Sequence, residues 1–326
     1  MDKIRIDNEL EEFFLNEVSL DKIKDHIIRT SIVAWNSVIS NVDIDTWLSN
    51  FNGNACGNKD IEQKIACWIL LYFTYFTEDD INELCKSLYR KYLRKKFDEL
   101  EGSPRYKNLD EKLEYILSNT IFLPMGNPSE SGGRILYNFR TQNDLPKECF
   151  EKNFTSYENV VLIDDLTITG EQAGRYIKEG RIDVRYKNLY FATFFATPEA
   201  IKHIAKIKNI NFLNVCVLDD RTKAFHESSF VFSHEKINKI IELAQQICEY
   251  YGQTIVNNFT STDLVYMKSH PLGFGNSQQL IGFEYNTPDN VLPILWGETS
   301  NWKNIFNRFT KKTTIEGGED FNGLYI

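Results

Sequence analysis

Apolar and polar positions follow two different periods along this chain of 326 residues. In its first part, apolar side chains recur at helical spacing, as at Leu10, Phe13 and Phe14, which predicts helices. From residue 120 onward, short and mostly apolar runs alternate with amphipathic stretches; the runs occupy 120–126, 160–163, 189–196 and 212–218. Such runs are typical of strands buried on both faces of a parallel sheet. The pattern therefore predicts an all-α part followed by an α/β part.

Capping and breaking residues divide the chain further. Asp60 is placed to cap an apolar helix over 61–76, and Thr77 to cap a long helix that ends near Glu101. Gly102 and Pro104 end that helix, and a short helix over 109–118 precedes the first strand. We predict a helical N-terminal domain at 1–118, an α/β domain at 119–309 and a polar tail at 310–326. Later elements are a short strand at 230–232, a helix at 235–251 and a strand at 279–285.

One stretch of the α/β part carries most of the candidate chemistry. The run at 160–163 is followed by Asp164, Asp165, Thr167, Thr169, Gly170, Glu171 and Gln172. In a parallel sheet the carboxyl ends of the strands face the ligand crevice. A Thr/Gly turn that opens a helix there presents backbone N–H groups and hydroxyls to an anion, beside two carboxylates that accept from hydroxyls. The stretch predicts a site for a phosphorylated sugar; the alternative is a buried strand that ends in two helix-capping aspartates.

Two other protein classes also place Asp-Asp after an apolar run, and both are excluded. A P-loop NTPase requires a Gly-x-x-x-x-Gly-Lys-Ser/Thr loop upstream, and the chain has none. A response-regulator receiver places this strand at the start of its domain, whereas here other strands precede it.

Composition restricts the classes of partner. The net charge of −9 argues against broad nucleic-acid binding. The six cysteines have no metal-binding spacing and are interpreted as reduced thiols. The most apolar run, 67–76, is far too short to span a membrane, and the N-terminus has no signal-peptide pattern. We therefore expect a cytoplasmic protein without a membrane partner. The basic stretch from Arg90 to Lys96 is either a solvated helix end or a weak docking patch for nucleic acid or an acidic partner.

The stretch from Val160 to Gly170 resembles the ribose-phosphate loop of type I phosphoribosyltransferases, in which an apolar strand, an acidic pair and a Thr-Gly turn occur in this order. The resemblance implies a parallel sheet with flanking helices that binds phosphoribosyl pyrophosphate with Mg²⁺. It implies that Asp164 and Asp165 bind the ribose and that Thr167, Thr169 and Gly170 bind the phosphate. The family usually continues with Gly-Thr, whereas this chain has Glu171 and Gln172, and a glutamate at that place repels phosphate.

The same resemblance suggests three further site regions. The turn after the first core strand, with Ser131, Gly132, Gly133 and Arg134, is expected to bind pyrophosphate, and an ordinary turn is the alternative. Asp219 and Asp220 follow a later strand and contact either base or metal, or form a salt-linked turn. Trp296 lies in an Asn-Thr-Pro and Leu-Pro segment and either stacks on the base as part of a hood or packs as a loop over the sheet edge.

Two functions follow from the resemblance. The pattern is similar to a divergent branch of the fold found in bacterial conflict and phage-defence systems. The first function is an effector that transfers or cleaves the ribosyl group of phosphoribosyl pyrophosphate or a nucleotide. The alternative is a catalytically inactive nucleotide-binding sensor or scaffold that works with other defence proteins.

Overall fold

The computed structural model describes residues 3–102, 105–126, 131–232, 237–260 and 262–308. Helices dominate the N-terminal part: α1 (Asn8–Asn16), α2 (Leu20–Ala34), α3 (Asn41–Leu48), α4 (Lys59–Leu71), α5 (Glu78–Glu99) and α6 (Leu109–Ser118), with strand β1 (Thr74–Phe76) between α4 and α5. Strands and helices alternate in the middle: β2 (Thr120–Pro124), α7 (Ser131–Gln142), η1 (Lys147–Cys149), β3 (Ser156–Thr167), α8 (Glu171–Lys178), β4 (Arg185–Ala196), α9 (Pro198–Ile204), β5 (Ile210–Val217) and η2 (Asp220–Thr222). The C-terminal part comprises α10 (Ile237–Asn257), η3 (Thr262–Ser269), η4 (Phe274–Asn276), β6 (Ile281–Phe283) and α11 (Pro293–Trp296).

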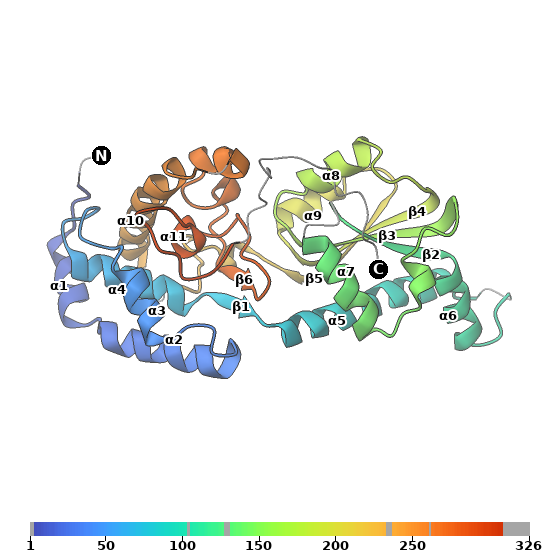
Figure 1. The fold of residues 1–326 in the computed structure, drawn as a ribbon, viewed down its shortest axis with the longest axis horizontal. Coiled ribbons are helices and arrows are strands. Elements are labelled where there is room, and N and C mark those ends of the chain that lie inside the picture. Colours follow the sequence, from blue (N-terminus) through green and yellow to red (C-terminus); the bar gives the residue numbers. More distant parts are fainter. Residues whose placement is uncertain (1–2, 103–104, 127–130, 233–236, 261, 309–326) are drawn as a thin grey trace, which may run out of the picture.

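The four middle strands form a parallel sheet in the order β2-β3-β4-β5 (Figure 1). The register pairs Phe122 with Val161 and Val161 with Tyr190, so neighbouring apolar runs lie side by side. All four strands run in the same direction, and their carboxyl ends therefore meet at one edge. The predicted alternation of strands and helices, and with it the α/β fold class, is confirmed.

The sheet is covered on both faces, which explains why its strands are apolar without alternation. Val160 and Leu162 of β3 belong to the cluster that α8 and α9 close with Ala173 and Ala200. The neighbouring residues Val161 and Ile163 belong to the larger core, which includes side chains of α5 and α7. Figure 1 shows α8 and α9 on one side of the sheet and α5 on the other.

Contacts in this core cross the boundary predicted at 118/119. Trp47 of α3 is fully buried and donates from its indole Nε1 to the carbonyl oxygen of Ile294 at 2.7 Å. Strand β1 pairs in parallel with β6, with Tyr75 opposite Gly282. Helix α5, expected in the helical domain, lies against the four-stranded sheet through Tyr92, whose ring packs edge-on against Tyr190 of β4. The first four helices thus share a core with α10 and α11, and the division at 118/119 stays a prediction.

Some predicted elements differ in their limits. The helix predicted over 61–76 ends at Leu71, and Thr74–Phe76 forms β1 because its backbone pairs with β6, a partner two hundred residues away. Strand β3 continues past Ile163 to Thr167. Residues 230–232 form no strand. The strand predicted at 279–285 is present as β6, and the helix predicted at 235–251 is α10, described from Ile237 to Asn257.

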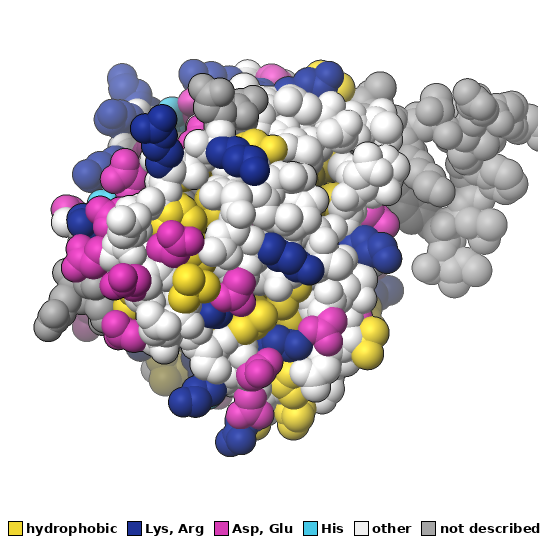
Figure 2. Space-filling view, turned by 90° about the vertical axis from the view of Figure 1, so that its left-hand side faces the viewer, with side chains coloured by type: hydrophobic (Ala, Val, Ile, Leu, Met, Phe, Trp, Pro, Cys, Tyr) yellow, Lys and Arg dark blue, Asp and Glu magenta, His cyan; other side chains and the backbone are white. Residues whose placement is uncertain are grey.

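Side chains of both charge signs lie on the surface. Figure 2 shows the face at the left of Figure 1, where basic and acidic side chains are interspersed with apolar ones. All six cysteines are free thiols, and four of them are buried. Among the described residues, no helix is both long enough and apolar enough to cross a membrane.

Candidate functional site

The turn between β3 and α8 is held tightly against the start of α9. Gly170 caps α8 with a left-handed backbone, φ 73°. A Cβ at this position would lie 3.1 Å from the carbonyl oxygen of Ala200, so glycine alone fits both the backbone angle and the space. The Thr167 carbonyl accepts from the Thr197 N–H at 3.2 Å, and the Thr169 hydroxyl accepts from the Glu171 N–H at 3.3 Å. The turn is therefore a fixed backbone structure at the carboxyl edge of the sheet.

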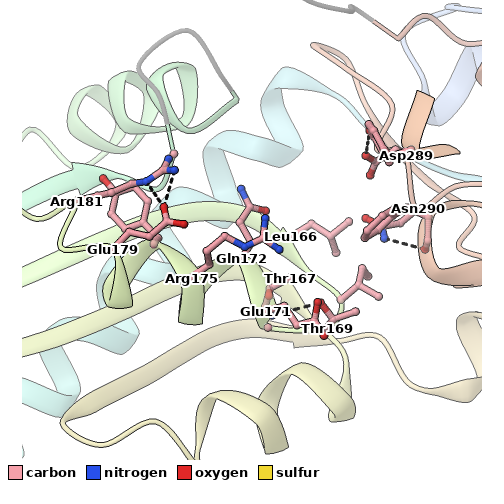
Figure 3. Close-up of a pocket in the computed structure, with 16 residues that line it drawn as sticks. Leu166, Thr167, Thr169, Glu171, Gln172, Arg175, Glu179, Arg181, Asp289 and Asn290 are labelled. Atoms are coloured by element: carbon pink, nitrogen blue, oxygen red, sulfur yellow. Dashed lines mark hydrogen bonds and ion pairs between the residues drawn. The ribbon is translucent and has the colours of Figure 1, made fainter. Parts of the chain in front are cut away.

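A cavity of about 480 Å³ opens beside this turn (Figure 3). One side is the turn itself and the exposed flank of α8, and the other side comes from the C-terminal part of the chain. Its lining residues are Gly126, Leu166, Thr167, Ile168, Thr169, Gly170, Glu171, Gln172, Arg175, Tyr176, Glu179, Arg181, Tyr266, Phe274, Asp289 and Asn290. Thr167, Thr169 and Gly170, which the resemblance assigns to the phosphate, all line this cavity, and Glu171 and Gln172 line it with them.

Arg175 adds a cation to the lining of the cavity. It lies one turn of α8 beyond Glu171, and no carboxylate among the described residues pairs with it. Arg181, by contrast, is bound to Glu179 at 2.6 Å. The N-terminus of α8 and the guanidinium of Arg175 both contribute positive potential to this side of the cavity. The glutamate at 171 partly opposes that charge.

The acidic pair lies within β3, so its two carboxylates point to opposite faces of the sheet. Asp164 follows the face of Leu162, is 8% exposed, and accepts from the Asp165 N–H at 3.0 Å. Asp165 follows the face of Ile163 and accepts from the Leu166 N–H at 2.8 Å. Neither carboxylate lines the cavity. The structure thus brings the predicted phosphate turn to a cavity, but neither of the predicted ribose acids lines it.

Asp165 is bound instead by a residue of the C-terminal part. The hydroxyl of Tyr285 donates to Asp165 Oδ2 at 2.9 Å. Burial, followed by the charges of Asp165 and Asp164, raises the pKa of Tyr285 well above its ordinary value, so this hydroxyl stays protonated and keeps donating. One of the two acids is therefore engaged by the chain itself.

The residues predicted to bind pyrophosphate form the first turn of a helix. Ser131, Gly132, Gly133 and Arg134 begin α7, while 127–130 lie outside the described residues. Arg134 Nη2 binds Glu78 at 2.6 Å, and its guanidinium lies 5.6 Å from the centre of the Tyr285 ring. Glu78 also accepts from Asn138 at 3.0 Å. Arg134 thus joins α5, α7 and the Tyr285 segment, and the ion pair occupies the charge that was expected to bind phosphates.

The residues predicted to contact the base do not line the cavity. Asp219 binds Arg221 at 2.7 Å and Asp220 binds Lys223 at 2.7 Å, which matches the salt-linked turn that was the alternative. Trp296 is 2% exposed; its indole donates to the Val291 carbonyl at 2.9 Å and stacks on Phe259. It packs in the core shared with α10.

The basic stretch of α5 is only partly a surface feature. Lys96 is 5% exposed and donates to Glu99 at 2.6 Å and to Asn159 Oδ1 at 3.0 Å. Lys91 is exposed and donates to the carbonyl oxygens of Asn214 at 2.6 Å and Val215 at 3.2 Å, both in β5. Arg90, Arg94 and Lys95 also remain on the exposed side of α5. The stretch therefore serves partly to attach α5 to the sheet.

Several cavity residues have no counterpart among the predicted ones. Arg175 lies only three positions after Gln172, and the helical spacing from Glu171 to Arg175 was a readable sign that both face the same side. Tyr266, Phe274, Asp289 and Asn290 come from a region without regular periodicity. Their convergence on the turn depends on long-range packing, and the sequence carries no local sign of it.

The fold and the turn together define a phosphoribosyltransferase-like α/β protein. The chain belongs to the PRTase-CE family, whose model matches residues 44–308. The match begins within α3 and includes the C-terminal wall of the cavity, so the family unit also extends across the 118/119 position.

A crystal structure of a hypothetical protein from Neisseria gonorrhoeae with bound ppGpp is similar over 53% of this chain and 97% of its own, with 11% identity and a TM-score of 0.29. A likeness of this size carries no argument about function. No curated protein matches the chain.

Proposed function

We propose that the protein binds a ribose-5-phosphate-type ligand, either phosphoribosyl pyrophosphate or a nucleotide, in the cavity beside the Thr167–Gly170 turn. The observation that carries this proposal is the cavity itself, because it opens at the turn that the family resemblance gives to the 5′-phosphate. The N–H groups at the start of α8 and the guanidinium of Arg175 supply the positive potential for that phosphate.

The favoured activity is transfer or cleavage of the ribosyl group. Breaking the bond at the anomeric carbon develops positive charge on the ribose ring, and a fixed carboxylate nearby lowers the barrier. Asp165 is the carboxylate we assign to this role. It reaches the ligand only when the hydroxyl of Tyr285 gives way to a ribose hydroxyl, since both compete for Asp165 Oδ2. We further propose that this activity serves as an effector in bacterial antiviral defence.

Mg²⁺ is the cation expected with phosphoribosyl pyrophosphate. The described residues contain no group of three or more side chains suited to hold a metal. Mg²⁺ in such sites is bound largely through ligand phosphates and water, with one or two carboxylates from the protein. Asp165, on the strand that leads to the turn, is the carboxylate we assign to such a contact, and the metal would neutralise the leaving pyrophosphate.

A second candidate function is a catalytically inactive sensor that binds the nucleotide and passes its presence to partner proteins. The bond between Tyr285 and Asp165 favours it, because this bond keeps one ribose acid occupied by the chain. The carboxylates of Asp164 and Asp165 also lie outside the cavity lining. In a sensor, the same turn binds the phosphate but no bond is broken.

Calorimetry with phosphoribosyl pyrophosphate and Mg²⁺ tests the binding proposal. Arg175→Ala should weaken binding about tenfold or more, since a charged hydrogen bond to the phosphate is lost. Arg185→Ala is the matched control: this arginine is also exposed, but it begins β4 at the opposite edge of the sheet, and its loss should leave affinity unchanged. Wild-type affinity in Arg175→Ala would exclude the turn as the phosphate site.

A turnover assay distinguishes the enzyme from the catalytically inactive sensor. Release of pyrophosphate or free base by the wild-type protein, lost in Asp165→Asn while the ligand still binds, supports the enzyme. Tight binding without any product, in wild type and variant alike, supports the sensor.

A further inference from the structure

A second concave site lies away from the ligand cavity, between α6 and η1, and we call it the α6 groove. Its volume is about 590 Å³. Helix α6 ends directly before β2 begins, so the groove lies at the amino-terminal edge of the sheet, whereas the ligand cavity lies at the carboxyl edge. Figure 1 shows α6 at the end of the molecule opposite α1 to α4. The α6 groove is therefore separate from the proposed ligand site.

The floor of the α6 groove is apolar. Leu113 and Leu117 lie four positions apart on α6, so they share one side of the helix, and both are half-buried. Cys149 of η1 is buried against them, and its thiol donates to the carbonyl oxygen of Leu117 at 3.5 Å. Leu109, one turn before Leu113, is 66% exposed and continues the same row. At 1.5 Å per residue the row is about 12 Å long, which favours an extended occupant over a small molecule.

Carboxylates surround this apolar floor. Asp110 and Glu114 lie four positions apart on α6, and Glu148 lies on η1. No lysine or arginine is among the residues that line the groove. None of the three carboxylates has an ion pair or a hydrogen-bond partner within the described part of the chain, although all three are exposed. The groove thus combines unpaired negative charge with accessible apolar surface.

We propose that the α6 groove is the docking site for a basic amphipathic helix of a partner protein. Apolar side chains on one face of that helix cover the row of Leu109, Leu113 and Leu117. Lysines or arginines beside them pair with the surrounding carboxylates, which fixes the orientation of the helix. The inference goes beyond the proposed function, because the two sites lie at opposite edges of the sheet.

Charge argues against a second copy of the chain as the occupant. The net charge is −9, so two copies repel each other. Helix α5 exposes arginines and lysines but no apolar side chain that could cover the floor. Helix α2 exposes Ile32 and Val33, but the neighbouring Arg29 is already paired with Asp25 at 2.9 Å. These contacts favour a separate, basic partner.

Fluorescence anisotropy with designed peptides tests the proposal on the full-length protein. The probe is a labelled helical peptide with leucines at positions i, i+4 and i+7 and lysines at the positions beside them. Its control is a scrambled peptide of the same composition, which has the same charge but no apolar face. Wild-type protein should bind the helical probe about tenfold or more tightly than the scrambled peptide. Equal binding of the two peptides would overturn the proposal, because charge alone would then account for it.

A charge reversal in the groove makes the test specific. Glu114→Lys combined with Glu148→Lys should weaken binding of the basic probe about tenfold or more. The same variant should gain binding of a peptide in which glutamates replace the lysines, and misfolding cannot produce that gain. The matched control is Glu12→Lys combined with Glu249→Lys, two exposed helical positions outside the groove that change the net charge equally.

Two further outcomes would overturn the proposal. The first is an equal effect of both double variants, since the groove would then not be the place of binding. The second is a dimer of the wild-type protein in sedimentation that only Glu114→Lys with Glu148→Lys dissociates, since a second copy would then occupy the groove. The calorimetry with phosphoribosyl pyrophosphate is independent of these outcomes, because its ligand and Arg175→Ala act at the other edge of the sheet.

Discussion

At the scale of single residues, the site depends on positions where one side chain, or its absence, decides what the backbone can do. Gly170 permits the left-handed step that aims the start of α8 at the cavity, and it permits the turn to approach Ala200. Asp165 is the opposite case. Its carboxylate was predicted to bind a ligand, but it already accepts a hydrogen bond from Tyr285. The identity of a residue therefore indicates a capability, and its contacts decide whether that capability is available.

Gly170→Ala should destabilise the protein more than Gly180→Ala. Both glycines have a left-handed backbone, which costs a residue with a Cβ about 1–2 kcal/mol. Gly180 has open space around it, whereas a Cβ at Gly170 meets the Ala200 carbonyl and the Ile204 side chain, both at 3.1 Å. Urea unfolding of the two variants measures the difference, expected at about 1 kcal/mol or more. Equal losses would show that the turn moves freely away from α9.

At the scale of elements, the C-terminal segment after β6 is fastened to the central strand of the site. Tyr285 reaches from this segment to Asp165 of β3, and Glu284 accepts from the backbone N–H of Glu78 at the start of α5. Arg134 adds α7 to the same junction through Glu78. Four separate elements are thus tied together near the carboxyl end of β3.

Tyr285→Phe should lower the free energy of unfolding by about 1–2 kcal/mol, because Asp165 loses a buried hydrogen-bond donor. Tyr186→Phe is a suitable comparison, since Tyr186 is 39% exposed and its ring lies at the far edge of the sheet. Chemical denaturation of both variants at neutral pH gives the two values. A stability for Tyr285→Phe equal to that of the control variant would mean that water replaces the hydroxyl without cost.

Sequence reasoning succeeded where the chemistry is local and failed where it is not. Three predicted features depend only on residues that are close together in the sequence: the apolar strands, the cap at Thr77 and the Thr-Gly turn. The structure contains all three. The strand at 74–76 was missed because its apolar run continues the preceding helix and only pairing with β6 makes it a strand. The positions of Asp289 and Trp296 could not be predicted either, because they too depend on contacts between distant parts of the chain. One lines the cavity and the other lies in the core, and their neighbours in sequence do not distinguish them.

At the scale of the whole molecule, the chain folds back so that its first and last parts share one core. The side chain of Asn50 donates to the Lys303 carbonyl at 2.8 Å, and Trp47 donates to Ile294. Rings of Phe73 and Phe306 stack at 4.1 Å. Helix α3, within which the family match begins at residue 44, thus contacts residues more than two hundred positions away.

A fragment of residues 1–118 should not fold by itself. Its α3 and α4 would expose the surface that α10 and α11 cover, and its α5 would expose the surface that meets the sheet. Thermal unfolding followed by circular dichroism should show no cooperative transition for this fragment, in contrast to the full chain. A sharp transition would support the division at 118/119.

The attachment of Lys91 has a consequence for how separate molecules behave toward each other. Strand β5 is the last strand of the described four-stranded sheet, and such a strand offers its main-chain groups to any extended peptide nearby. Lys91 reaches over from α5 and engages two of its carbonyl oxygens, at Asn214 and Val215. Because a charged lysine already occupies these carbonyl oxygens, we expect this margin to resist pairing with a strand of a second molecule.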